Sequence, residues 1–336
     1  MKANNVIING FKDVVIQEEE LDENSINAGE CLIETSLSVI SAATELSRYY
    51  SLKKGATYPV RPGYCSVGTI LAKGSNVKHV EVGDRVMFSG PHSSLQIYDC
   101  AKSDGGILYK LKPETSDEAG AFLMMAWIAM NGILPADVKF GDKVVVLGLG
   151  SLGLLVSVIY QYMGFDVIAA DPVEHRCELA KTMGIKQVLS CKPEEQVAKI
   201  TALTNEKGAD IVVDASGLSS VIETATLVAG KYGQVILMGT PREEYVTNST
   251  IMLNAIHMKM LTVIGSLNRR YTYDNTSTSR VTMKRSMEYL EDLLNNKIID
   301  VDKFISHHVK PQQIGEAYTG LMENKEAYLT VVIDWK

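Results

Sequence analysis

The sequence predicts an α/β protein that combines a doubly wound parallel sheet with a separate β-rich domain. From residue 143 to residue 264, short apolar runs alternate with helical stretches, which is typical of a parallel sheet covered on both faces. Before about residue 126, the apolar runs are instead punctuated by Gly, Asn, Asp and Pro, which indicates a β-rich domain. The length of 336 residues also favours about two domains.

The segment 143–171 carries the most specific pattern in the chain. An apolar, β-branched run leads directly into Gly-Leu-Gly-Ser-Leu-Gly at residues 148–153. Gly148 permits a tight turn, Gly150 leaves room for a pyrophosphate, and Gly153 lets the next helix pack against the strand. A second apolar run ends in Asp171, about 20 residues past the glycines, where a carboxylate can accept the ribose hydroxyls of NAD. This order predicts a dinucleotide site, because a merely structural glycine turn does not account for Asp171.

The same patterns predict the remaining elements. In the β-rich part we expect strands at 31–40, 66–72, 85–89, 95–99 and 107–111, followed by a helix at 118–131. In the alternating part we expect strands at 143–147, 167–170, 187–189, 211–213, 235–238 and 261–264, with helices that include 173–183, 194–203 and 219–227. The polar stretch 268–279 is expected to be a loop. It precedes a helix at 281–294, a strand at 305–309, a helix at 312–323 and a strand at 328–333. This tail is too short to build its own core, so it should return to the first domain.

Composition excludes several other classes of protein. The formal net charge is −7 and no basic cluster is visible, which argues against nucleic acid as a partner. The five cysteines form neither a C-x-x-C pair nor a disulfide framework, which favours a reducing, cytoplasmic compartment. The N-terminus lacks the apolar core of a signal peptide, and no apolar run approaches the ~18 residues of a membrane span. We therefore expect a small-molecule partner and no membrane insertion.

Six stretches carry a family resemblance that covers nearly the whole chain. They are GTILAKGSNVKHVEVGDRVMF, EAGAFLMMAWIAMNGI, GDKVVVLGLGSLG, ADIVVDASG, YGQVILMGT and ISHHVKPQQIGEAY. They resemble the medium-chain dehydrogenase/reductase superfamily, the fold of alcohol dehydrogenases and quinone reductases. The resemblance implies a GroES-like catalytic barrel at 1–126, a Rossmann cofactor domain at 127–267 and a return to the barrel at 268–336. It also implies an active site in the cleft between domains and a homodimer joined through the last strand of the cofactor domain.

The departures from the family pattern concern zinc. Zinc-dependent members supply a thiolate from a Cys-Gly-Thr-Asp-like motif, and this chain has Ala42-Ala43-Thr44-Glu45 there. They supply an imidazole and a carboxylate from Gly-His-Glu, where this chain has Gly63-Tyr64-Cys65. No Cys, His, Asp or Glu lies between residues 119 and 135, and the cysteine-rich structural zinc lobe is missing. Catalytic zinc needs three protein ligands, so we expect no metal, with a site built from Cys65, His92 and a third group as the alternative. The phrases ISAATEL and PGYCSVG are most similar to the zinc-independent branch around bacteriochlorophyllide hydroxyethyl dehydrogenase. This similarity does not identify a substrate for the present chain.

Without zinc, a side chain has to act on the substrate oxygen. Thr44 stands where family members place a proton-relay hydroxyl, and its alternative role is to cap a turn. Tyr64 replaces a ligand histidine and is expected on the opposite wall of the cleft, as a donor or as a plain aromatic wall. His92 suits acid–base work and an outward proton relay, or else a structural hydrogen bond. Glu45 could orient Thr44 or support the backbone.

For the cofactor we expect NAD, because Asp171 would repel the 2′-phosphate of NADP. Arg176, five residues further on, could stack on the adenine or neutralise a phosphate. Ser216, Gly217 and Gly239 follow later strands at the carboxyl edge of the sheet, and the resemblance implies that they line the nicotinamide channel. The expected cofactor-binding residues are Gly148, Gly150, Ser151, Leu152, Gly153, Asp171, Arg176, Ser216, Gly217 and Gly239.

The resemblance and the site residues together predict a zinc-independent, NAD-dependent oxidoreductase. It would interconvert a secondary alcohol, such as a polyol, a sugar or a specialised metabolite, and its ketone. The first alternative is a quinone or enone reductase, which also needs no metal but usually prefers NADPH. The second alternative is a non-catalytic nucleotide-binding relative, which the missing zinc ligands favour and the intact glycine motif with Asp171 opposes.

Overall fold

The computed structural model describes residues 1–50, 57–100, 106–241, 243–267, 271–274 and 281–336 of the chain. The described chain forms two compact units. The first unit contains Met1–Met125 and Tyr271–Lys336, and the second contains Ala126–Arg270. Of the polar stretch 268–279 that was expected to be a loop, residues 268–270 and 275–279 lie outside the described residues. Within the described parts, no helix is long and apolar enough to span a membrane.

The second unit contains a six-stranded parallel sheet. Its strands are β8 (Lys143–Leu147), β9 (Asp166–Asp171), β10 (Gln187–Ser190), β11 (Ala209–Asp214), β12 (Ala229–Leu237) and β13 (Thr262–Gly265). The strand order is β10-β9-β8-β11-β12-β13, which is the doubly wound Rossmann order. The predicted fold class is therefore confirmed for this part of the chain.

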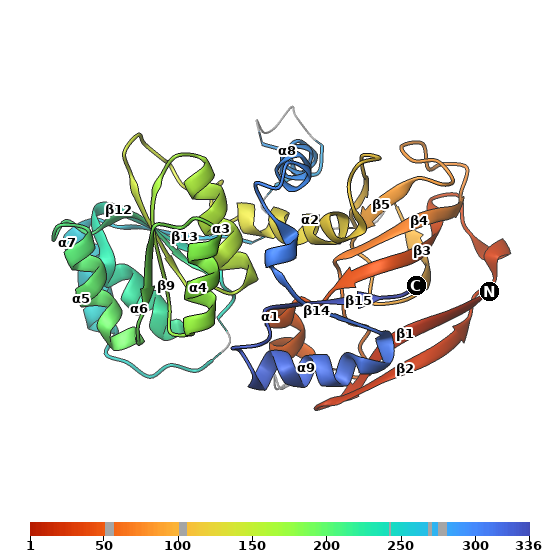
Figure 1. Ribbon diagram of the computed structural model, residues 1–336, viewed down its shortest axis with the longest axis horizontal. Coiled ribbons are helices and arrows are strands. Elements are labelled where there is room, and N and C mark those ends of the chain that lie inside the picture. Colours follow the sequence, from red (N-terminus) through yellow and green to blue (C-terminus); the bar gives the residue numbers. More distant parts are fainter. Residues whose placement is uncertain (51–56, 101–105, 242, 268–270, 275–280) are drawn as a thin grey trace. The chain divides into compact units, whose positions relative to one another are not determined.

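Helices cover both faces of this sheet, as the strand–helix alternation predicted. They are α3 (Ser151–Tyr162), α4 (Glu174–Thr182), α5 (Pro193–Leu203), α6 (Ser219–Val228) and α7 (Ser249–Lys259). In Figure 1, α3 and α4 lie on one face of the strands and α5, α6 and α7 on the other. The β8 side chains of Val144–Leu147 are fully buried, because the strand has a neighbour on each side and helices above and below. The helix α7 was not predicted from the sequence.

The first unit is a GroES-like sheet domain, mostly antiparallel. Its strands are β1 (Lys2–Gly10), β2 (Asp13–Glu20), β3 (Glu30–Val39), β4 (Ser66–Lys73), β5 (Arg85–Phe88), β6 (Leu95–Asp99), β7 (Leu108–Lys110), β14 (Ile305–Val309) and β15 (Thr330–Asp334). Seven strands form one sheet in which β3 pairs with β4, β6 and β15, so β3 is its centre. The β1–β2 hairpin was not predicted, although Val6 and Ile8 of β1 are fully buried.

The helical elements of the first unit include α1 (Ala42–Glu45), followed directly by the π-helical turn η2 (Leu46–Tyr50). Helix α2 (Asp117–Met130) contains the division between the two units. The C-terminal part adds α8 (Met283–Asn295) and α9 (Ile314–Glu323), and the short 3-10 turns are η1 (Glu23–Ser25), η4 (Val301–Lys303) and η5 (Pro311–Gln313). Residues of α9 and β15 join β1 in one apolar cluster, which fixes the C-terminal segment to the N-terminal strands.

Candidate active site and nucleotide site

Three hydroxyl groups meet at the start of α1. Ser41 is the N-cap residue of α1, and its Oγ is hydrogen-bonded to the phenol oxygen of Tyr64. The Oγ1 of Thr44, one turn further along, lies 3.3 Å from the same phenol oxygen. We call Ser41, Thr44 and Tyr64 the hydroxyl cluster. The expectation that Thr44 and Tyr64 lie on opposite walls was wrong, because α1 begins close enough for the two hydroxyls to touch.

Ser41 was not among the predicted site residues. A serine directly before Ala-Ala-Thr-Glu is a typical N-cap residue, and that was the available sequence signal. The neighbouring Gly63 has φ +104°, and a Cβ there would lie 2.7 Å from the backbone nitrogen of His92. Glycine is therefore required for the chain to pass His92 and deliver Tyr64 to the hydroxyl cluster.

Behind the hydroxyl cluster, a fully buried carboxylate collects three hydrogen bonds. The Oε1 of Glu45 accepts from the backbone N–H of Ser41 at 2.7 Å. The Oε2 of Glu45 accepts from the phenol of Tyr318 at 2.6 Å and lies 3.1 Å from Nε2 of His92. The side chains of Glu45 and His92 are both 0% exposed. Glu45 thus supports the backbone that carries Ser41, which is one of the two roles expected for it.

His92 is held from its other side as well. Its Nδ1 lies 2.8 Å from the Oγ of Ser38, and that Oγ accepts from the indole N–H of Trp335 at 2.9 Å. If Ser38 donates to Nδ1, the Nε2 of His92 carries the proton that Glu45 accepts. Every donor in the series from Trp335 to Glu45 then has an acceptor. The structure turns His92 inward onto Glu45 and Ser38, so the imidazole itself has no exposed surface for an outward proton relay. Ser38, Tyr318 and Trp335 were not predicted.

The surroundings shift the pKa values of Glu45 and Tyr64 in opposite directions. Burial opposes ionisation of Glu45, but the interaction with His92 and the hydrogen bonds from His92, Tyr318 and Ser41 outweigh it and lower the pKa of Glu45. Burial raises the pKa of Tyr64 well above its ordinary value, assisted by Cys65 and Glu45 and opposed by the hydrogen bonds to Ser41 and Thr44. Tyr64 is therefore a neutral hydrogen-bond donor at physiological pH, in front of an ionised Glu45.

The residues at the zinc-ligand positions do not fit a zinc site. Ala42 has no donor atom, the Tyr64 phenol is bound to Ser41, and burial raises the pKa of the Cys65 thiol well above its ordinary value. Among the residues that the structure describes, no group of three or more His, Cys, Asp and Glu side chains could hold a metal ion. The alternative site built on Cys65 and His92 therefore lacks the ligands that tetrahedral zinc requires.

The glycine motif of the second unit forms the tight turn between β8 and α3. Gly148 follows β8 with φ +94°, a conformation that strongly favours glycine. A Cβ on Gly153 would lie 1.8 Å from the carbonyl oxygen of Gly148, so only glycine lets α3 pack this closely on the turn. A Cβ on Gly150 would meet no atom within 4 Å, and Gly150 is the N-cap of α3 without a side-chain cap. Ser151 and Leu152 form the first turn of α3, where helix N–H groups can bind phosphate.

Asp171 lies at the carboxyl end of β9, beside this turn. Its Oδ2 accepts from the N–H of Leu149 at 2.7 Å, and its Oδ1 accepts from the N–H of Val173 at 2.8 Å. Each carboxylate oxygen accepts one backbone N–H and has a lone pair for a second hydrogen bond. The Nη1 of Arg176 lies 3.9 Å from Oδ2 of Asp171, so the two charges are adjacent.

Ser216, Gly217 and Gly239 lie at the same edge of the sheet. A Cβ on Gly148 would lie 3.1 Å from the Cβ of Ser216, which follows β11. Gly217 has φ +69°, and a Cβ on Gly239 would lie 2.1 Å from its nitrogen. The strand order therefore brings the three residues to the glycine turn, at the crevice where doubly wound sheets bind ligands.

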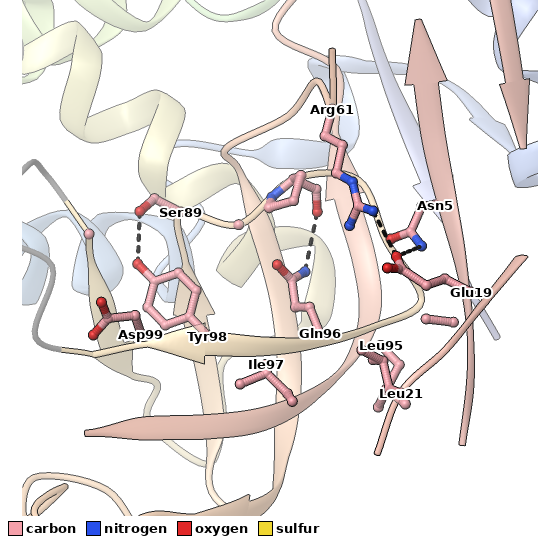
Figure 2. Close-up of a pocket in the computed structure, with 14 residues that line it drawn as sticks. Asn5, Glu19, Leu21, Arg61, Ser89, Leu95, Gln96, Ile97, Tyr98 and Asp99 are labelled. Carbon is pink, nitrogen blue, oxygen red and sulfur yellow. Dashed lines mark hydrogen bonds and ion pairs between the residues drawn. The ribbon is translucent and has the colours of Figure 1, made fainter. Parts of the chain in front are cut away.

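The first unit also has a cavity of about 440 Å³ between the β1–β2 hairpin and β6. Figure 2 shows Arg61 and Glu19 paired at its rim, at 2.7 Å, with Asn5 donating to the same carboxylate at 3.2 Å. Elsewhere in the lining, the Gln96 amide donates to the Pro91 carbonyl at 3.2 Å. None of the four predicted catalytic residues lines this cavity, so it is distinct from the hydroxyl cluster.

Two family models match the chain. The alcohol dehydrogenase GroES-like domain matches residues 27–136, and a domain described as zinc-binding dehydrogenase matches residues 151–282. The two matches follow one another in the order of the two units. The chain belongs to the medium-chain dehydrogenase superfamily. One of the two matching models carries zinc in its description.

Relatives in the medium-chain dehydrogenase superfamily match over long stretches. An uncharacterised zinc-type alcohol dehydrogenase-like protein of Haemophilus influenzae is 24% identical over 95% of both chains. The D-guloside 3-dehydrogenase of Escherichia coli K12 is 29% identical over 76% of this chain and 72% of its own.

Solved structures of dehydrogenases show the same fold. Galactitol-1-phosphate dehydrogenase from Escherichia coli has a TM-score of 0.84 at 20% identity, over 98% of this chain and 99% of its own. A short chain alcohol dehydrogenase from E. coli CFT073, in complex with NADH, has a TM-score of 0.78 at 19% identity over 99% of both chains. A protein from Sinorhizobium meliloti 1021 bound to NADP has a TM-score of 0.80 at 16% identity over 99% of both chains.

Proposed function

We propose that this protein is a zinc-independent, NAD(H)-dependent oxidoreductase that interconverts a secondary alcohol and its ketone. The observation that carries the proposal is the hydroxyl cluster, because Tyr64 supplies a hydrogen-bond donor at a position where zinc-dependent relatives place a metal ligand. The relatives named for D-guloside and galactitol 1-phosphate support a polyol or sugar as the substrate class.

The cofactor would be held by the second unit. The pyrophosphate would bind the first turn of α3 beside Gly150, and the adenosine ribose would bind Asp171. Arg176 partly neutralises Asp171, yet Asp171 also accepts two backbone N–H groups, which keeps its carboxylate at the ribose position. A 2′-phosphate would meet this carboxylate, which supports NAD over NADP. When bound, the nicotinamide supplies or accepts the hydride.

In this proposal the hydroxyl cluster acts on the substrate oxygen. Because Tyr64 remains protonated, it donates a hydrogen bond to the carbonyl oxygen as negative charge develops there. Thr44 and Ser41 contact the same phenol and can replace or remove its proton. Glu45 and His92 do not reach the substrate; they hold Ser41 and the start of α1 in register with Tyr64.

The assembly would be a homodimer joined at β13. This strand is the edge of the parallel sheet, with Val263 39% exposed and Leu267, just after it, 63% exposed. The preceding helix α7 exposes Leu253 and Met258 as well. An open edge with apolar neighbours is a site for pairing with another strand, and a second copy of β13 would cover it.

The experiment that tests the function is a substrate screen of the whole chain. Polyols, sugars and their ketones are tested beside enones and quinones, each with NAD(H) and NADP(H) and with a chelator present. Turnover of an alcohol–ketone pair with NAD(H) supports the proposal. Turnover of enones or quinones alone, with NADPH preferred, would identify the quinone or enone reductase instead. Tight NAD binding without turnover of any compound would favour the non-catalytic relative.

A further inference from the structure

Two of the five cysteines, far apart in sequence, lie side by side in the first unit. The Sγ atoms of Cys31 and Cys100 are 3.4 Å apart. Cys31 lies on β3, directly opposite Tyr98 of the antiparallel strand β6. Cys100 is two residues beyond Tyr98, so its side chain points to the same face of the sheet. Its backbone N–H donates to the carbonyl of Gly29 at 3.0 Å, which fixes it against β3.

The two thiols differ in access and in acidity. Cys31 is fully buried in the core of the first unit beside Ile33, whereas Cys100 is partly exposed. The hydrogen bond from Cys100 lowers the pKa of Cys31, against the effect of burial and with help from Lys73. The same contact, together with burial, raises the pKa of Cys100. Cys100 is therefore the sulfur that a dissolved oxidant can reach, and the more acidic Cys31 lies 3.4 Å away as its partner.

We infer that Cys31 and Cys100 form an oxidisable dithiol site that a two-electron oxidant such as hydrogen peroxide converts to a disulfide. One sulfur attacks the peroxide O–O bond and becomes a sulfenic acid, with release of water. The other sulfur then attacks the sulfenic sulfur, and the S–O bond breaks to release a second water. Two thiols and one peroxide thus give one disulfide and two waters.

The geometry favours bond formation between these two sulfurs. A disulfide needs the sulfurs about 2 Å apart, so they have to approach by about 1.4 Å. Cys100 follows the last residue of β6, so it can move toward Cys31 without breaking the pairing of β3 with β6. Cys177 offers the contrast: it is buried, and its thiol donates to the carbonyl oxygens of Asp171 and Leu189. Both cysteines lie in the first unit, and their oxidation needs neither substrate nor cofactor, so its failure would leave the proposed function unaffected.

The test is oxidation of the purified full-length chain with hydrogen peroxide, followed by alkylation in denaturant and mass spectrometry. We expect two of the five thiols to be lost, the mass to fall by two hydrogens, and one cross-linked peptide pair to contain Cys31 and Cys100. A reducing agent such as dithiothreitol should restore all five thiols. The Cys100→Ser variant, changed at the partly exposed position, should form no disulfide, whereas Cys177→Ser should behave as the wild type.

Other products would overturn the inference. They are retention of all five thiols, a disulfide that uses Cys65, Cys177 or Cys191, a bond between two chains, or sulfinic acid on Cys100 with Cys31 still alkylated. Formation of the same cross-linked peptides in unfolded chains at the same rate would also contradict it, because the folded geometry would then not select the pair.

Discussion

The carboxylate of Glu45 can be replaced by the amide of glutamine with almost no change in shape. The amide oxygen can still accept hydrogen bonds, but the NH₂ group then faces a donor: Ser41 on one side, or Tyr318 and His92 on the other. At least one charge-assisted hydrogen bond is lost, which costs about 1.5–3 kcal/mol of stability. The remaining hydrogen bonds then have a neutral acceptor in place of the carboxylate. We expect Glu45→Gln to lower the free energy of unfolding by about 3 kcal/mol.

The pH dependence separates this mechanism from a simple packing defect. Because the pKa of Glu45 in the folded protein lies below its ordinary value of 4.5, its ionisation stabilises the fold above that value. The stabilisation is lost as the pH falls through the lowered pKa. The difference in the free energy of unfolding between wild type and Glu45→Gln should therefore be largest at neutral pH and become smaller in acid.

Urea unfolding of both proteins at several pH values measures this difference. Glu20→Gln, at an exposed residue at the end of β2, is the matched control and should change stability by less than about 0.5 kcal/mol. Tyr318→Phe removes one donor to Glu45, and its effect should be less than additive with that of Glu45→Gln. Equal unfolding midpoints for wild type and Glu45→Gln, or a gap that does not change with pH, would refute the reasoning.

Three further predictions concern the nucleotide site and the assembly. Gly150→Ala should keep the stability but weaken NAD binding at least about tenfold, since its Cβ points into open space where the pyrophosphate would lie. Gly153→Ala, unlike Gly150→Ala, should lower the unfolding midpoint, because its Cβ would clash with the carbonyl of Gly148. Identical stabilities of the two variants would contradict the assigned geometry. Asp171→Ser should narrow the preference for NAD over NADP, measured by fluorescence titration, and an unchanged ratio would remove Asp171 from the selection. Sedimentation should show a dimer at micromolar concentration, and Val263→Lys at the β13 edge should give a monomer; a wild type that is already monomeric would rule out this interface.

The Rossmann half of the fold could be predicted because its signals are local. The glycine turn, Asp171 and the strand–helix alternation each lie within a short window of sequence, and the parallel order follows from them. The predicted glycines and Ser216 could be assigned to one sheet edge for the same reason. By contrast, the β1–β2 hairpin and α7 were missed, because their mixed polar and apolar residues give no clear period.

The candidate site depends on contacts that no sequence period connects. Tyr318 reaches Glu45 across 273 positions, and Trp335 reaches Ser38 across 297. The Cys31–Cys100 contact spans 69 positions, so the cysteine spacing gave no sign of it. The family resemblance predicted Thr44 and Tyr64 as site residues. Only the fold shows that they contact each other and that His92 is hydrogen-bonded to Glu45.

The central claim is that Tyr64, without zinc, acts on the substrate oxygen. The most direct measurement is the kcat/KM of wild type and Tyr64→Phe, both freed of metal by a chelator and checked by elemental analysis, on a substrate found in the screen. The metal-free wild type should be active, and Tyr64→Phe should lose about 10²-fold with NAD affinity unchanged, the cost of one oxyanion-type donor. Full activity of Tyr64→Phe, or a wild type that holds about one zinc per chain and loses activity with it, would contradict the claim.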